Sequence, residues 1–249
     1  TDGIVGPYSV TQGFASSARA LGVRFYQDTE AIGITVVRDQ VQGILLNNGQ
    51  LEAPIVVNAG GPYAKQIGRM IGLDIPVKPY KRTSFFTAPT DKIRKDAPFI
   101  VDYSTGFGMR RESQVLKFGM QDPNAPESMD ITVDWDRLPI ILKAGIRRFP
   151  FLGDIGIKTG EAGLREDTAD KNAILGGVPE VKGLYLACGF SGHGLMHSPA
   201  IGRVMAECIM VVTLKEISTL CLAILLGLKT IISYRSFIWT HLIIRRIHS

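Results

Sequence analysis

The sequence has few cysteines and lacks the marks of a secreted protein. Only three cysteines occur in 249 residues (Cys188, Cys208 and Cys221), which argues against a disulfide framework and fits a reducing compartment. No N-x-Ser/Thr site is present, and the first residues have neither the basic start nor the apolar core of a secretory signal peptide. These absences predict a cytoplasmic or mitochondrial-matrix location.

The sequence also lacks an apolar run long enough to cross a membrane. The tail 211–249 is rich in Ile and Leu, but its uncharged stretch 217–228 has only 12 residues, whereas a spanning helix needs about 20. We therefore expect no membrane span. Because Arg235 and the pair Arg245-Arg246 follow, a helix lying at a membrane surface is one alternative, and a segment foreign to the fold is the other.

The basic residues show no concentration on one segment. The net charge is +5 and the pI is near 9.1, but the tightest groupings are the pairs Arg147-Arg148 and Arg245-Arg246, and no basic stripe alternates with aromatic residues. We therefore expect no nucleic-acid partner. A phosphate-bearing cofactor and a carboxylate substrate would account for part of the excess.

Apolar periodicity predicts helices and strands mixed along the first part of the chain. Residues 7–21 are expected to form a helix that begins at a proline and is followed by Gly22. Residues 62–71 are expected to form a second helix. Between them, four short β-rich runs follow one another, with Asn48-Gly49 as a hairpin signal, at 23–27, 31–37, 41–49 and 51–60.

The middle of the chain has its own pattern. Between residues 80 and 120, alternating runs predict an antiparallel sheet. Residues 131–148 predict an amphipathic helix, and 155–165 predict another strand. The fold class is therefore α/β with α+β character.

We expect a first domain that is interrupted by a second. The first comprises 1–76 plus 168–210, the second is the inserted segment 77–167, and 211–249 is an atypical tail. A small-molecule site between two such domains agrees with where pockets usually form.

The most informative segment is 183–203. An apolar run, Leu184 to Cys188, precedes a loop with glycines at 189, 192 and 194, and Ser198 and Pro199 are expected to open a helix. A strand, a glycine loop and a helix start let backbone N–H groups approach an electron-rich ligand, such as a phosphate, a carboxylate or a reduced flavin. The alternative is a connection that only turns a corner.

The amino-acid sequences of four segments resemble those of one known family. GLYLACGFSGHGLMHSPAIGR (183–203) is similar to the C-terminal flavin-binding segment of the D-amino-acid-oxidase superfamily, in the branch with sarcosine oxidases, dimethylglycine dehydrogenases and FAD-dependent oxidoreductase domain-containing proteins. VVNAGGPYA (56–64), GFGMRRES (106–113) and AGLREDTADKNAILG (162–176) resemble further family segments in the same order. The resemblance runs from about residue 2 to about residue 209.

The resemblance implies a partial FAD-binding, Rossmann-like domain with an inserted antiparallel-sheet substrate domain. Family members begin with a strand–GxGxxG–helix unit for the FAD pyrophosphate, and no GxGxxG occurs here, so the chain is expected to be the C-terminal portion of a larger enzyme. Gly163 stands where some members carry a flavin-linked cysteine, so FAD is expected to be non-covalent. The implied FAD contacts are Asn58, Ala59, Gly60, Gly61, Gly189, Phe190, Ser191, Gly192, His193, Gly194 and Leu195.

The resemblance also assigns substrate roles. Arg165 matches a position where glycine-oxidase-like members bind the substrate carboxylate, and a planar guanidinium can do so with two parallel hydrogen bonds; the alternative is a surface arginine paired with Glu166 or Asp167. His193 is the second catalytic candidate, as a hydrogen-bond donor or a base, against a loop histidine. Arg110 and Tyr103 are further substrate-site candidates.

No metal site is expected. His193 and His197 have the i, i+4 spacing of two helical ligands, but the neighbouring glycines and Pro199 argue against a helix across both, and no Glu follows the first His.

The expected activity is oxidation of a secondary or N-methylated amine or amino acid by hydride transfer to FAD. One alternative is oxidation of a 2-hydroxy acid, and another is a catalytically silent or assembly protein. The expected partners are a small amine or amino-acid substrate together with an electron acceptor or an assembly partner.

Overall fold

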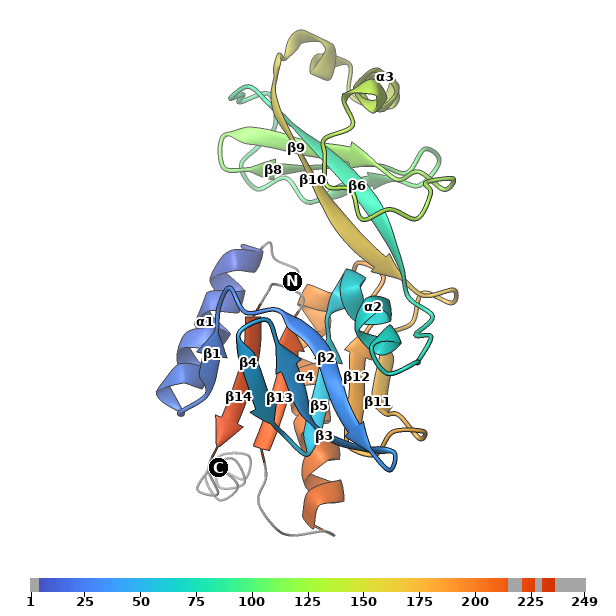
Figure 1. Cartoon of the computed structure of the whole chain (residues 1–249). Helices are drawn as coiled ribbons and strands as arrows, with labels where there is room; N and C mark the ends of the chain where they lie inside the picture. The colour runs from blue at the N-terminus through green and yellow to red at the C-terminus, as the bar shows by residue number, and fades with distance from the viewer. Residues whose placement is uncertain (1–4, 215–220, 227–229, 236–249) are drawn as a thin grey trace. The chain divides into compact units, whose positions relative to one another are not determined.

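The computed structural model describes residues 5–214, 221–226 and 230–235. The chain divides into two compact units (Figure 1): unit 1 comprises Thr1–Lys78 and Glu166–Ser249, and unit 2 comprises Pro79–Arg165. The units therefore change at 78/79 and 165/166, where the sequence analysis placed the boundaries at 76/77 and 167/168. The two described strands of the tail, Cys221–Leu226 and Thr230–Arg235, lie in unit 1.

Unit 1 is built around a six-stranded sheet. Its strand β5 (Ile55–Ala59) pairs in parallel with β12 (Leu184–Cys188) on one side and with β13 (Cys221–Leu226) on the other. The edges are antiparallel additions. The sheet order is β1 (Arg24–Tyr26), β14 (Thr230–Arg235), β13, β5, β12, β11 (Ile174–Gly177).

Both faces of β5 are covered, as its continuous apolar run requires. Val56 packs on one face with the meander β2 (Ala31–Val37), β3 (Gln40–Leu46) and β4 (Gly49–Glu52). Ile55 and Val57 point to the other face and pack against α4 (Gly194–Leu214). Figure 1 shows the resulting order of layers in unit 1, with the meander sheet and α4 on opposite sides of β5.

The N-terminal helix α1 (Pro7–Ala20) begins at its proline as predicted and has no buried residue. Gly22, just past its end, has φ +90°, which explains why a glycine follows the helix. The second predicted helix, 62–71, is shorter than expected. It consists of a 3₁₀ turn (Gly61–Tyr63) followed by α2 (Ala64–Arg69).

The start of α4 corrects the sequence analysis, which placed it at Ser198 and Pro199. The helix begins at Gly194, and Pro199 lies inside it. Pro199 has no N–H to donate to the carbonyl four residues earlier, which is that of Leu195. The Ser198 hydroxyl donates to this carbonyl instead, at 2.9 Å. Ser198 therefore satisfies the Leu195 carbonyl inside the helix and does not begin the helix.

The tail also differs from expectation. A surface helix was one alternative for 217–228, but Cys221–Leu226 forms β13, and β14 returns antiparallel to it. Residues 217–220, 227 and 228 lie outside the described part. Within the described part, no helix combines the length and apolarity that a membrane crossing needs.

Unit 2 is an antiparallel sheet with one helix. Its sheet order is β10 (Ile157–Asp167), β6 (Lys78–Thr87), β9 (Val115–Met120), β8 (Phe107–Glu112), β7 (Ile100–Asp102). The helix α3 (Leu138–Arg148) begins seven residues later than the expected 131–148, because Pro139 is tolerated only in a first helical turn. The core beneath α3 consists of Phe85, Phe107, Met109, Leu116, Phe118, Ile141 and Leu152.

Candidate functional site

The candidate site of unit 1 lies at the carboxyl ends of β5 and β12. These strands run in parallel, with Leu184 opposite Val56 and Leu186 opposite Asn58. The glycine turns that follow them, at Gly60 and at Gly189, therefore leave the sheet at the same edge. In open parallel sheets this edge is where ligands bind.

Asn58 fixes the first turn. Its side chain is 1% exposed, its Nδ2 donates to the Ala64 carbonyl at 2.9 Å, and its Oδ1 accepts the Gly60 N–H at 3.1 Å. Gly61 has φ +54°, and a Cβ added at Gly60 would lie 2.5 Å from Ile67 Cδ1. The Asn58 side chain is thus engaged by the backbone of the turn, Gly60 is buried beneath it, and Gly61 is partly exposed at the edge.

Gly189 opens the second turn, and no other residue fits there. Its φ is +73°, and an added Cβ would lie 2.5 Å from Thr168 Cγ2. Ser191 is buried with φ 53°; its hydroxyl donates to the Gly189 carbonyl and accepts the Thr168 N–H, both at 3.3 Å. The loop is therefore held against the returning segment that contains Thr168.

Glu166 holds the second turn and lies beside the first, and the sequence analysis considered it only as a partner for Arg165. Its main-chain carbonyl accepts the Ser191 N–H at 3.0 Å, and its Oε1 accepts the Phe190 N–H at 3.3 Å. A Cβ added at Gly61 would lie 3.9 Å from Oε2. The available sequence signal was its place two residues before Thr168 in the segment 162–176.

The segment after Glu166 is a compact turn. Asp167 is 3% exposed and pairs with Lys171 at 2.8 Å. The Thr168 hydroxyl donates to the Asn172 carbonyl at 2.7 Å. The Asn172 N–H, with further hydrogen bonds from Asn172 and Thr168, lowers the pKa of Asp170. Thr168-Ala169-Asp170 therefore turns the chain without a proline.

His193 lies directly before α4 with its side chain exposed. Its N–H donates to the Phe190 carbonyl at 3.0 Å, and its ring stacks on His197 with centroids 5.9 Å apart. Because α4 begins at Gly194, His197 lies in its first turn and His193 lies just outside it, so that no helix spans both, as expected. Among residues 5–214 and the two tail strands, no group of three or more His, Cys, Asp or Glu side chains could hold a metal.

Cys188 is the last residue of β12 and lies buried behind this edge. It is fully buried, as predicted for a small apolar residue at the end of the strand. Burial, with a smaller contribution from the negative charge of Glu166, raises the pKa of its thiol to about 12. The thiol is therefore protonated and unreactive at neutral pH.

In unit 2, two adjacent arginines point to opposite faces of β8. Arg111 shares the core face with Met109 and is 8% exposed; it donates to the carbonyls of Ser113 and Ile93 and pairs with Asp91. Arg110 lies on the other face and pairs with Glu112 at 2.9 Å. Arg111 therefore points into the core of unit 2, and the substrate candidate Arg110 points to the opposite face of the sheet.

The other substrate candidates lie apart within unit 2. Arg165 is partly buried on β10, which is separated from β8 by β6 and β9. Arg165 and Arg110 are therefore three strand spacings apart, which is about 14 Å in total. Tyr103 is 95% exposed in the turn after β7. Unit 2 alone therefore does not gather the three into one cluster.

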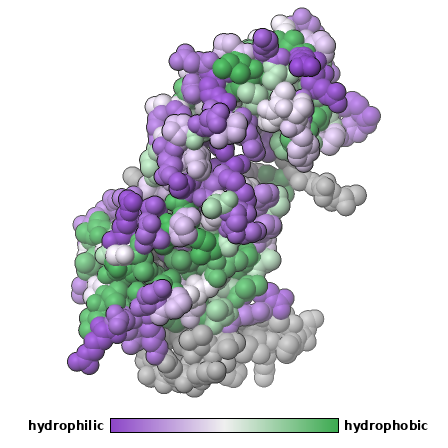
Figure 2. Space-filling view, turned by 90° about the vertical axis from the view of Figure 1, so that its right-hand side faces the viewer, coloured by the Kyte–Doolittle hydropathy of each residue, from purple (hydrophilic) through white to green (hydrophobic). Residues whose placement is uncertain are grey.

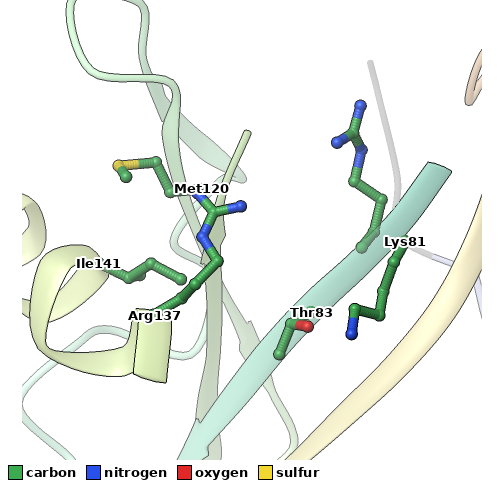
Figure 3. Close-up of a pocket in the computed structure, with 6 residues that line it drawn as sticks. Lys81, Thr83, Met120, Arg137 and Ile141 are labelled. Atoms are coloured by element: carbon green, nitrogen blue, oxygen red, sulfur yellow. The ribbon is translucent and has the colours of Figure 1, made fainter. Parts of the chain in front are cut away.

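A small pocket of unit 2 lies near the start of α3 (Figure 3). It is lined by Lys81, Arg82, Thr83, Met120, Arg137 and Ile141. Lys81 pairs with Asp130 at 2.6 Å, and Arg137 pairs with Asp122 at 2.9 Å. The Lys81 hydrogen bond, followed by those from Thr132, lowers the pKa of Asp130 to about 2. Two of the cations therefore already have carboxylate partners, and the pocket is a weaker candidate than the edge of unit 1.

Comparison with known proteins identifies the family of this chain. The sequence profile of the FAD dependent oxidoreductase family matches residues 1–208. Human mitochondrial sarcosine dehydrogenase is 26% identical over 223 residues, which cover 84% of this chain and 24% of that protein. Bovine FAD-dependent oxidoreductase domain-containing protein 1 is 28% identical over 244 residues, which cover 84% of this chain and 50% of that protein.

Two solved structures superpose on this chain. L-proline dehydrogenase from P. horikoshii superposes with a TM-score of 0.76 at 28% identity, over 83% of this chain and 56% of that one. Glycine oxidase from Bacillus cereus superposes with a TM-score of 0.70 at 25% identity, over 81% and 55%. The chain thus spans from about a quarter to just over half of the relatives it matches.

Proposed function

The chain belongs to the family of FAD-dependent oxidoreductases, and on that premise we propose that the carboxyl edge of β5 and β12 holds the flavin end of FAD. The observation that carries the proposal is the meeting of two glycine turns, Gly60-Gly61 and Gly189 to Gly194, at the start of α4. Backbone N–H groups and the positive end of a helix favour an electron-rich ring edge.

The residues of this edge suit a flat, non-covalent ligand. Gly61, Gly189 and Gly192 all have positive φ, so the backbone itself forms the contact surface. The thiol of Cys188 is buried on the inner side, and Gly163 stands where the family resemblance places a flavin link. Non-covalent binding through Gly60, Gly61 and residues 189–195 follows from this chemistry.

We propose a secondary or N-methylated amino acid as the substrate. FAD, when bound, accepts a hydride equivalent from the carbon attached to the substrate nitrogen. Arg165 holds the substrate carboxylate through a bidentate hydrogen bond. Arg110 and Tyr103 lie too far from Arg165 across the sheet of unit 2 to contact the same small substrate, so they are not part of this proposal. His193, exposed beside the glycine loop, is placed to donate a hydrogen bond. The names of sarcosine dehydrogenase, L-proline dehydrogenase and glycine oxidase support this substrate class.

A regulatory role is the second candidate. Mouse mitochondrial pyruvate dehydrogenase phosphatase regulatory subunit is 26% identical over 219 residues, which cover 83% of this chain and 25% of that protein. In that role the fold would bind a partner protein without turning over an amine. The mitochondrial names among the relatives favour the mitochondrial matrix as the location in either case.

The test is anaerobic reduction of the FAD-loaded chain by candidate substrates. Sarcosine or L-proline should bleach the flavin absorbance. Arg165→Ala should weaken the substrate-dependent rate about 30-fold through loss of about 2 kcal/mol of charge-assisted hydrogen bonding, with partial rescue in Arg165→Lys. Arg94→Ala, which removes an exposed arginine paired with Asp96, is the matched control. Bleaching by a 2-hydroxy acid alone would overturn the amine proposal, and bound FAD that no substrate reduces would favour the regulatory role.

A further inference from the structure

The carboxylate of Glu166 lies at the edge of the sheet, next to both glycine turns. Its main-chain carbonyl holds the Ser191 N–H, its Oε1 holds the Phe190 N–H, and its Oε2 faces the turn at Gly61. One residue thus holds the β12 loop through both its backbone and its side chain, and its carboxylate lies beside the β5 turn.

The side-chain contact is unusual for this position. A glycine loop at a helix start offers N–H groups to a ligand, yet the Phe190 N–H here already has an acceptor that belongs to the chain. Glu166 is partly buried, so its charge is screened less than a surface charge. The charge also reaches the neighbouring strand, since it contributes to the raised pKa of the Cys188 thiol.

We propose that Glu166 is a positioning residue whose carboxylate anchors Phe190 and makes the edge disfavour a ligand that gains negative charge. The positioning role stands on the hydrogen bonds within unit 1. The effect on charge rests on the proposed function, because reduction adds electron density to a flavin. A fixed negative charge at this edge raises the free energy of the reduced form relative to the oxidised form.

Two substitutions separate the hydrogen bond from the charge. Glu166→Gln keeps an acceptor oxygen for the Phe190 N–H but removes the charge. Glu166→Ala removes both. Glu207→Gln is the matched control, because Glu207 is an exposed carboxylate on α4 of the same unit, paired with Arg203.

The first experiment needs no flavin and uses residue-resolved amide exchange on the full chain. Glu166→Ala should accelerate exchange of the Phe190 amide at least fivefold. The Ser191 amide, held by the main-chain oxygen of residue 166, should change less than twofold. Glu166→Gln and Glu207→Gln should leave both amides unchanged. An unchanged Phe190 amide in Glu166→Ala would overturn the positioning role, and so would equal acceleration of both amides.

The second experiment measures the midpoint potential of FAD bound to each variant. Glu166→Gln should favour the reduced flavin at least tenfold over wild type, an upward shift of about 30 mV for a two-electron couple, and Glu207→Gln should not. An unchanged potential in Glu166→Gln would overturn the charge effect, even if Glu166→Ala does not fold. If wild type and all variants retain no FAD, the proposed function fails instead, and amide exchange alone upholds or overturns the role of Glu166.

Discussion

The two units supply candidate residues in different ways. In unit 1 the edge is made by backbone: Gly61 and Gly189 have conformations that disfavour a side chain, and the side chains of Asn58 and Glu166 accept the N–H groups of Gly60 and Phe190. In unit 2 the candidates are side chains on a sheet, where adjacent residues such as Arg110 and Arg111 face opposite ways. The role of a candidate residue therefore follows from the backbone conformation in unit 1, and from the face of the sheet on which its side chain lies in unit 2.

The surfaces of the units differ as well. Figure 2 shows apolar side chains gathered over the visible face of unit 1, whereas the visible face of unit 2 is more polar. Ile32, Leu45 and Leu175 are among the large apolar residues that unit 1 exposes. Unit 2 instead closes its aromatic core beneath α3. Unit 2 also exposes large apolar residues, among them Phe99, Ile131 and Ile140. The units therefore differ in how apolar side chains gather on the visible surface and not in whether such side chains are exposed.

The strongest test of the backbone-built edge is Gly189→Ala. The positive φ and the 2.5 Å approach to Thr168 Cγ2 act together, so we expect a loss of about 3 kcal/mol in the free energy of unfolding. Gly72→Ala is the control, because it has φ +78° with nothing within 4 Å, and it should lose about 1 kcal/mol. Urea unfolding measures both; equal losses would show that the close approach does not matter.

The side-chain comparison in unit 2 is tested by substituting each arginine. Arg111→Ala leaves the carbonyls of Ser113 and Ile93 without their charged donor and should lower the free energy of unfolding by about 2 kcal/mol. Arg110→Ala removes only a partly exposed ion pair with Glu112 and should cost less than about 0.5 kcal/mol. Urea unfolding again reports the result. A larger effect from Arg110 would reverse the assignment of the two faces.

The smallest expected effect concerns Cys188. Its pKa is raised from 9.0 to about 12 in the folded chain, so unfolding releases the thiol proton between these values and stability falls as pH rises through that window. Relative to Cys188→Ala, wild type should lose about 1 kcal/mol between pH 9 and pH 10. Denaturant unfolding of both proteins at each pH checks this. Parallel pH dependence in the two would contradict a buried, protonated thiol.

Much of unit 1 could be predicted from the sequence because its signals are local. The run Leu184 to Cys188 forms β12, and the glycines that follow it take positive φ where the turn needs them. The start of α4 could not be predicted, because Ser198 repairs the carbonyl that Pro199 leaves, and that contact exists only in the folded helix.

The remaining errors come from contacts between segments distant in the sequence. Glu166 meets Phe190 across 24 residues, so no spacing rule indicated it. The inward face of β8 depends on which side α3 covers, and this decided between Arg110 and Arg111. The late start of α3, in contrast, could have been predicted from the sequence, because Pro139 is tolerated only in a first helical turn.

The central claim is that the carboxyl edge of β5 and β12 holds a flavin. Its most direct test is the visible absorption spectrum of the purified chain after incubation with FAD and desalting. We predict retained, structured flavin bands in wild type and their loss in Gly189→Ala. A wild-type chain that keeps no flavin would contradict the claim that this polypeptide forms the cofactor site.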